Sequence, residues 1–243
     1  MCAFAARSGS SLSRRLVIAL ALLALLSTQS GCEPRHENPD HASPIVHQDS
    51  EYVLAILLDL SGSFTELMTK DGKAYRFAMR VADKYLRRMD SNDRLIISQL
   101  SATNKALLWD GSPIALRRSF PSANAFRDFL LSKSDPNGSR IHDGIADTLD
   151  YLLALPGVQS GKTKSALFVL SDMIDNAPEP EKSKERLLQA LAAYGRAGGG
   201  VAFLWVDSSL VLPWRTHLKD AGIAHFAVES EIVVDPPLPT FED

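Results

Sequence analysis

The chain has 243 residues, of which 45% are hydrophobic and 23% are charged, with 26 Lys and Arg against 29 Asp and Glu. Residues 1–31 contain three Arg and no acid, so the remainder carries 23 basic against 29 acidic residues and is mildly acidic. No basic stripe stands out that could neutralise phosphates, and nucleic acid is therefore excluded as an expected partner.

The first 31 residues predict a secretory signal peptide. Arg7, Arg14 and Arg15 precede an apolar run over 16–26. Such a run is too short to span a bilayer comfortably as a helix, but it suits the hydrophobic core of a signal. We therefore expect the protein to be exported.

The end of this leader, Gln29-Ser30-Gly31-Cys32, resembles a bacterial lipoprotein box, in which the Cys becomes the acylated first residue of the mature protein. Gln29 stands where such a box usually has Leu. Cys2 leaves with the signal, so Cys32 lacks a partner thiol, which acylation would explain. The alternative is cleavage nearby that leaves an incidental Cys. The resemblance implies lipid anchoring to a membrane on the exported side of the bacterial cell envelope, which is periplasmic in a Gram-negative cell.

Two segments flank the predicted domain. Residues 32–50 combine prolines, acids and three His with few apolar residues, which predicts a flexible tether. The spacing of the three His in such a strand does not preorganise a metal site. Residues 230–243 form a similar proline-rich C-terminal tail. The domain itself is expected to span 51–229.

The domain opens with an apolar strand that ends in a polar turn. Tyr52-Val-Leu-Ala-Ile-Leu-Leu58 is followed by Asp59, Ser61 and Ser63. Alternate residues of an extended turn point the same way, so one carboxylate and two hydroxyls can share a face. These are the oxygen ligands that small hard cations prefer, and the turn predicts a site for Mg²⁺ or Mn²⁺.

Strands and helices then alternate along the chain. A stripe of apolar residues at helical spacing covers 74–89, and further helices are expected at 123–133, around Ile145, at 184–196 and at 214–220. The expected strands between them lie at 94–100, 106–109, 166–170, 201–206 and 225–228. This alternation predicts an α/β fold in which helices cover both faces of a doubly wound, mostly parallel sheet.

Two later loops carry further oxygen ligands. Ser139 lies in a polar loop that opens the helix around Ile145, and Asp172 follows the strand at 166–170. In parallel sheets, ligands bind at the carboxyl ends of the strands, where Asp59 and Asp172 are both expected.

In these motifs the chain resembles the von Willebrand factor A domain, whose metal-ion-dependent adhesion site joins D-x-S-x-S to a Thr and an Asp from two later loops. Asp59, Ser61 and Ser63 match the first loop, Asp172 matches the third, and Ser139 stands where the family usually has Thr. The resemblance implies a six-stranded sheet with the 106–109 strand antiparallel at one edge. It also implies an envelope-anchored adhesion or scaffold module that captures an acidic residue of a partner protein through the metal.

Two motifs do not support an enzyme, and two alternatives remain open beside this reading. The segment 157–163 is similar to a phosphate-binding loop, but Pro156 replaces its first glycine and a strand follows instead of a helix. Ser61 lacks the flanking glycines and the His base of a nucleophile. A metal-dependent hydrolase would need a protein base, and a metal-independent interaction domain would bind by surface contacts alone. We expect a binding protein and no enzyme, with His142 at the surface or behind the metal ligands.

Overall fold

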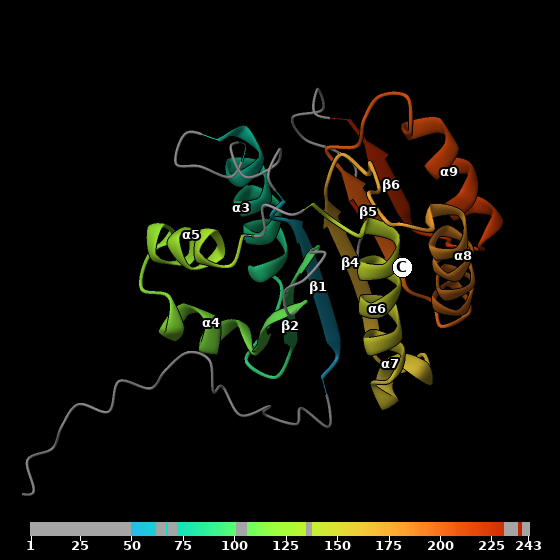
Figure 1. Cartoon of the computed structure of the whole chain (residues 1–243). Coiled ribbons are helices and arrows are strands. Elements are labelled where there is room, and N and C mark those ends of the chain that lie inside the picture. The colour runs from blue at the N-terminus through green and yellow to red at the C-terminus, as the bar shows by residue number, and fades with distance from the viewer. Residues whose placement is uncertain are drawn as a thin grey trace, which may run out of the picture. The chain divides into compact units, whose positions relative to one another are not determined.

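Six β-strands form the centre of the protein in this computed structural model (Figure 1). They are β1 (Tyr52–Asp59), β2 (Arg94–Leu100), β3 (Leu107–Gly111), β4 (Lys164–Leu170), β5 (Gly200–Leu204) and β6 (Phe226–Glu229). The sheet order is β3-β2-β1-β4-β5-β6, and only the β2–β3 pair is antiparallel. The order of winding reverses between β1 and β4, which confirms the predicted doubly wound sheet with an antiparallel edge strand.

The structure describes residues 50–61, 67, 72–100, 106–134, 138–230 and 238–239. All of these belong to the unit that begins at Ala42. The predicted signal peptide, Cys32, Ser63, most of the tether and most of the tail lie outside the described residues. Among the helices in these ranges, none combines the length and apolar composition that a membrane crossing requires.

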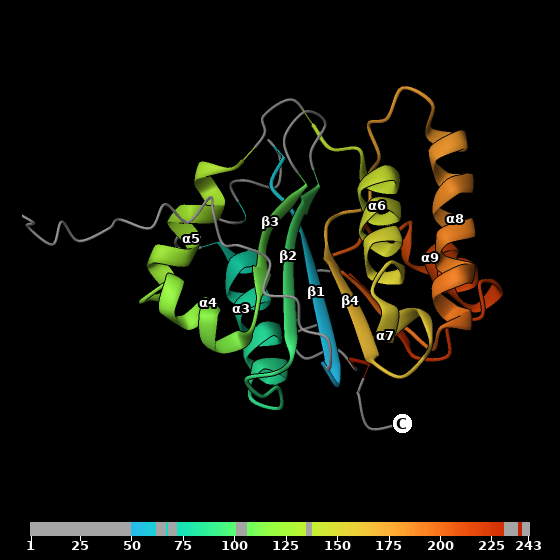
Figure 2. The same ribbon diagram turned by 90° about the horizontal axis from the view of Figure 1, so that it is seen from below.

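Helices cover both faces of the sheet. They are α3 (Lys73–Leu86), α4 (Pro113–Ser119), α5 (Ala123–Ser132), α6 (Ile141–Leu153), α7 (Pro156–Gln159), α8 (Pro180–Arg196) and α9 (Val211–Asp220). Figure 2 shows α6 and α8 on one side of the sheet and α3, α4 and α5 on the other. In β1, Val53 and Leu57 pack with the α6, α8 and α9 layer, while Leu54 and Leu58 pack with the α3 layer. This alternation is what a strand buried on both faces requires.

Two short helices, α4 and α7, were absent from the predicted elements. Both begin with proline, at Pro113 and Pro156, whose fixed φ suits the first turn of a helix. The Ser112 side chain also caps α4 by accepting a hydrogen bond from the backbone N–H of Ala115. Seven and four residues are too few to show helical periodicity.

The α6 helix lies very close to the sheet, and Gly144 permits this approach. A Cβ atom at this position would lie 2.7 Å from the Leu100 Cδ2 atom of β2. The glycine therefore lets the first turn of α6 lie against β2.

A closed ion cluster, which consists of Arg94, Asp110 and Tyr151, joins β2, β3 and α6. The guanidinium of Arg94 donates to both carboxylate oxygens of Asp110, at 2.8 and 2.6 Å, and to the Tyr151 hydroxyl at 2.8 Å. The Tyr151 hydroxyl in turn donates to Asp110 at 2.6 Å. Only 11% of each charged side chain is exposed. Every charge in this cluster thus has its partner within the fold.

Candidate functional site

The carboxyl edge of the sheet brings Asp59 together with Ser61 and Ser171. Asp59 ends β1 and is 1% exposed. Its Oδ1 accepts a hydrogen bond from the Ser61 backbone N–H at 3.0 Å, and its Oδ2 accepts one from the Ser171 hydroxyl at 2.9 Å. Burial raises the pKa of Asp59, against the opposing effect of these hydrogen bonds, and the nearby Asp172 charge raises it further.

The other predicted ligands lie in the neighbouring loops. Asp172 is half-buried after β4, and its Oδ1 accepts a hydrogen bond from the Ile174 backbone N–H at 2.9 Å. Ser139 is buried before α6, and its carbonyl accepts one from the Asn176 backbone N–H at 3.2 Å. The remaining predicted ligand, Ser63, lies outside the described residues.

The prediction of Mg²⁺ or Mn²⁺ as a cofactor is wrong by this structure. Within the described ranges, no group of three or more His, Cys, Asp and Glu side chains is placed to hold a metal ion. Both Asp59 oxygens already accept hydrogen bonds from the protein, and one Asp172 oxygen does so too. The sequence resembled a metal site because two carboxylates, Asp59 and Asp172, accompany several hydroxyls. In the structure, oxygens of these carboxylates instead accept hydrogen bonds from backbone N–H groups of their own loops and from the Ser171 hydroxyl.

A buried His–Asp pair, His142 and Asp175, lies beside this edge. From the sequence, His142 was predicted to lie at the surface or behind the metal ligands. The His142 Nδ1 atom of α6 lies 2.7 Å from the Asp175 Oδ2 atom, with 10% and 4% of the side chains exposed. The Asp175 Oδ1 atom accepts hydrogen bonds from the backbone N–H groups of Ile141 and Ala177, at 2.9 and 3.2 Å. Burial raises the pKa of Asp175, but the His142 contact and these two bonds outweigh it and leave the pKa below its ordinary value.

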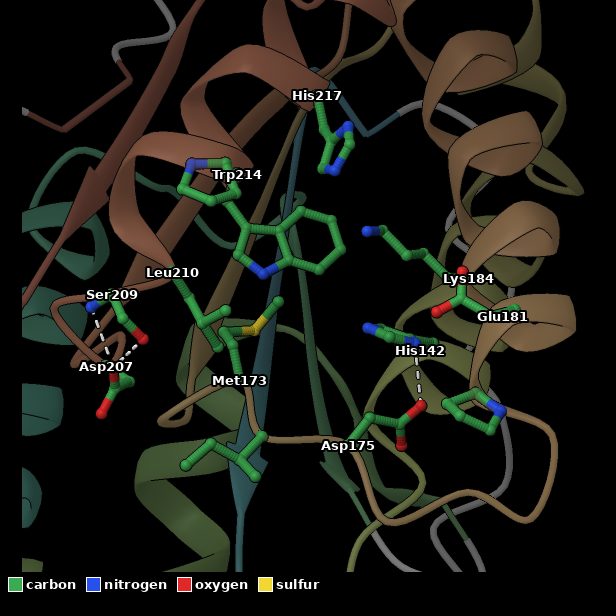
Figure 3. Close-up of a pocket in the computed structure, with 13 residues that line it drawn as sticks. His142, Met173, Asp175, Glu181, Lys184, Asp207, Ser209, Leu210, Trp214 and His217 are labelled. Atoms are coloured by element: carbon green, nitrogen blue, oxygen red, sulfur yellow. Dashed lines mark hydrogen bonds and ion pairs between the residues drawn. The ribbon is translucent and has the colours of Figure 1, made fainter.

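The pair opens onto a cavity of about 440 Å³ between α8, α9 and the loops that follow β4 and β5. We call it the α8–α9 pocket. Figure 3 shows His142, Lys184 and His217 reaching into it from α6, α8 and α9, around the ring of Trp214. The residues that line it are His142, Met173, Ile174, Asp175, Pro180, Glu181, Lys184, Asp207, Ser209, Leu210, Pro213, Trp214 and His217.

Among the described residues, His142 is the basic side chain of the pocket that contacts an acidic partner directly. Lys184 is half-buried and makes no ion pair with any residue that the structure describes. Burial lowers the pKa of His217, the positive charge of Lys184 and His142 lower it further, and Asp220 opposes them only in part. The pocket therefore combines Lys184 and two His side chains with the carboxylates of Asp175, Glu181 and Asp207.

Backbone strain is concentrated at the same edge. In the described part of the chain, the only residues other than glycine with positive φ are Met173, at 65°, and Trp205, at 71°. They follow β4 and β5, and Met173 lines the pocket. Such conformations cost about 1–3 kcal/mol each and cluster at functional sites. The Ser171 hydroxyl supports the first turn by accepting a hydrogen bond from the Met173 backbone N–H at 3.0 Å.

One exposed apolar side chain lines the pocket. Ile174 is 50% exposed there, whereas Leu212, which is 72% exposed on α9, is not among the lining residues. Ile114, which is 40% exposed on α4, lies away from the pocket on the other face of the sheet. These exposed side chains were not predicted from the sequence, because single apolar residues in loops and helix starts show no periodicity.

Comparison with known proteins gives similarity at the level of structure only. No family model and no curated protein matches the sequence. Proximal thread matrix protein 1 from the mussel byssus is 13% identical, with a TM-score of 0.45, over 75% of this chain and 45% of that one. The pilus adhesin SpaC from Lactobacillus rhamnosus GG is 11% identical, with a TM-score of 0.48, over 75% of this chain and 28% of that one. The chain thus spans less than half the length of either protein.

Proposed function

We propose that the protein is a metal-independent protein-binding module, and that its binding surface is the carboxyl edge around the α8–α9 pocket. The observation that carries this proposal is the exposed apolar side chain of Ile174, which lines a cavity of about 440 Å³. Large apolar side chains that remain in water next to a concave site are typical of interaction surfaces. The strained turn at Met173 supports the same edge.

The same pocket gives little support to catalysis. A His–Asp pair could serve as a general base, but a nucleophile would have to stand within hydrogen-bond reach of the imidazole. Ser209 is the only hydroxyl side chain among the described residues that line the pocket, and it donates to Asp207 at 2.6 Å. We therefore propose a binding protein and no enzyme.

The proposal extends to the family and to the location. The order of Asp59, Ser61 and Asp172 at the carboxyl edge of a mostly parallel sheet supports membership of the von Willebrand factor A family, without its metal. The basic and apolar leader supports export, and Cys32 supports a lipid anchor in the bacterial envelope. One acyl chain binds membranes only marginally, so stable anchoring requires the several chains of a mature lipoprotein.

Site-specific photo-crosslinking in intact cells tests the surface. A photoreactive amino acid is placed at Ile174 or, as the matched control, at Ile114, which is similarly exposed on α4. We expect Ile174 to trap a partner protein and the control not to trap it. A common product at both positions, or products only at Ile114, would show that the carboxyl edge is not the binding surface.

A further inference from the structure

We propose that the basic outer surface of α3 and α4 contacts a membrane that carries anionic phospholipids. This inference goes beyond the proposed protein-binding function, since it concerns a second surface and another kind of partner. It depends on the charge of one helical layer, on the exposed side chains of α4 and on the point at which the chain enters the domain.

Positive charge is concentrated on one side of the sheet. The segments 73–88 and 113–133, which contain α3, α4 and α5, hold ten Lys and Arg against two Asp. The helices of the other layer, α6 to α9, hold six Lys and Arg against six Asp and Glu. The chain as a whole is mildly acidic, so this basic layer was not predicted from its composition. A layer with such an excess of one charge attracts a surface of the opposite charge.

Exposed basic side chains form a stripe along α3. They follow one another at intervals of three or four residues, which places them on one face of the helix: Lys73, Arg76, Arg80, Lys84 and Arg87. Asp83 is the one acidic residue of α3, and it forms an ion pair with Arg87 at 2.7 Å. The opposite face of α3 packs in the core. The helix has 14 residues and is about 21 Å long, so the stripe offers an extended line of charge to a flat surface.

The short helix α4 adds an apolar side chain and two further charges to this layer. Ile114 is 40% exposed, and Arg117 and Arg118 lie three and four residues later, on the same face of the helix. Both arginines are exposed and form no ion pair with a residue that the structure describes. An exposed apolar side chain beside basic ones suits an anionic membrane, because the apolar group enters the interface while the charges meet the headgroups.

The chain enters the domain beside the end of this stripe. The Ser50 hydroxyl donates a hydrogen bond to the Asn92 carbonyl at 2.9 Å, in the turn that follows α3. The α4 helix begins at the same edge of the sheet, because the antiparallel strand β3 ends with Gly111 opposite Leu95 at the start of β2. A membrane anchor upstream of Ser50 therefore brings the end of α3 and the start of α4 toward the membrane.

The proposed lipid site supplies such an anchor. Cys32 precedes Ser50 by 18 residues, which span at most about 60 Å when fully extended. This reach exceeds the length of α3, so an anchor at Cys32 allows the whole stripe to contact the membrane. A lipid chain together with basic side chains binds an anionic membrane more stably than the lipid chain alone.

Nucleic acid is the other common polyanion, and the exposed apolar side chain argues against it. Phosphates would meet the same Lys and Arg side chains, but the backbone of a duplex offers no apolar layer to Ile114. The proposed export and lipid anchor place anionic headgroups, and not nucleic acid, next to this layer. The basic layer therefore fits a membrane better.

Co-sedimentation of the full chain with lipid vesicles tests the surface. Every protein carries Cys32→Ser, so that no acyl chain contributes, and the leader is the same in all of them. The vesicles consist of phosphatidylcholine alone or of an equimolar mixture with phosphatidylglycerol. We expect tighter binding to the mixture than to phosphatidylcholine, and loss of this difference at high salt, because salt screens the attraction between exposed charges.

Two double variants and a matched control locate the contact. We expect Lys73→Gln/Arg76→Gln on α3 and the corresponding α4 variant, with both arginines replaced by Gln, to bind the mixed vesicles about fivefold more weakly for each charge removed. The control Lys182→Gln/Lys219→Gln removes two exposed charges from the other layer and should leave the affinity unchanged.

Three results would overturn the proposal: equal binding to both kinds of vesicle, an unchanged affinity in the α3 or the α4 variant, or an equal loss in the control. Tighter binding to a DNA duplex than to the mixed vesicles at the same ionic strength would overturn it in favour of nucleic acid. If crosslinking at Ile174 traps a protein while vesicle binding fails, the proposed protein-binding function stands and only the membrane contact is lost.

Discussion

Two clusters of charged side chains differ in how their charges are paired: one contains Arg94, and the other contains Lys184. In the closed ion cluster, Arg94 and Asp110 bond to each other twice and share Tyr151. In the α8–α9 pocket, Lys184 has no acidic partner among the described residues, and the pKa of His217 is lowered by burial and by its basic neighbours. Buried charges that form ion pairs with each other hold elements together, whereas charged side chains that line a pocket without forming ion pairs can contact a ligand.

The largest effect is expected from breaking the closed cluster. Asp110→Ala leaves the Arg94 guanidinium buried without its carboxylate, and we expect the free energy of unfolding to fall by about 3–5 kcal/mol. Urea unfolding measures this change. Asp150→Ala is the control, because it breaks an ion pair with Arg186 in which 56% of the Asp side chain is exposed, and it should cost about 0–1 kcal/mol. Equal losses in the two variants would contradict the assignment of Arg94 and Asp110 as a structural pair.

Asp59 is intermediate in character between the two clusters. Its carboxylate accepts hydrogen bonds, but it forms no ion pair with a described basic side chain. Its pKa is raised in the folded protein, so ionisation destabilises the fold as the pH rises through 3.8 and beyond. Asp59→Asn should therefore raise the free energy of unfolding at neutral pH, by an amount on the order of 1 kcal/mol. The gain should shrink as the pH falls below 3.8, where the carboxyl is protonated in both states. A variant less stable than the wild type at neutral pH would show that the charge is needed at this position.

In the pocket, removal of charge should change stability little. We expect Lys184→Met to alter the free energy of unfolding by no more than about 0.5 kcal/mol, since Lys184 pairs with no described residue. The pKa of His217 should rise toward 6.5, because one source of repulsion has gone. Thermal unfolding and NMR titration measure the two quantities. A large loss of stability would reveal that Lys184 supports the fold, as Arg94 does.

No effect is expected from divalent metal. The described residues hold no group of three or more His, Cys, Asp and Glu side chains placed for a metal ion, and the unfolding temperature should be the same in Mg²⁺ and in EDTA. Calorimetry of the wild type in both buffers makes the comparison, with Asp59→Asn as a reference that lacks the carboxylate. Stabilisation by Mg²⁺ in the wild type alone would restore a metal role for Asp59.

The fold could be predicted from the sequence because long periodic segments dominate it. The expected strand at 94–100 coincides with β2, and the stripe at 74–89 lies on α3. The start of α8 at Pro180 lies four residues before the expected Lys184, because a proline and charged residues open that helix without apolar periodicity.

The site was harder to predict. Asp59 at the end of β1 and Asp172 after β4 do lie at the carboxyl ends of neighbouring strands, as predicted. The orientation of their carboxylates depends on hydrogen bonds that form only in the folded loops. The pair of His142 and Asp175 joins the first turn of α6 to the loop after β4, and the pocket joins three helices. No spacing along the chain encodes such contacts. The sequence thus indicated the edge of the sheet at which these side chains lie, but not the contacts that they make.

The most direct test of a metal-independent surface is the retention of the protein that crosslinks at Ile174. Its co-purification with the wild type, Ile174→Ser and Ile114→Ser is compared in Mg²⁺ and in EDTA. We predict equal recovery in the two buffers for the wild type and for Ile114→Ser, and a loss of about tenfold or more for Ile174→Ser, as expected when an apolar contact is removed from the centre of an interface. Loss of the partner in EDTA, or full retention by Ile174→Ser, would contradict the account.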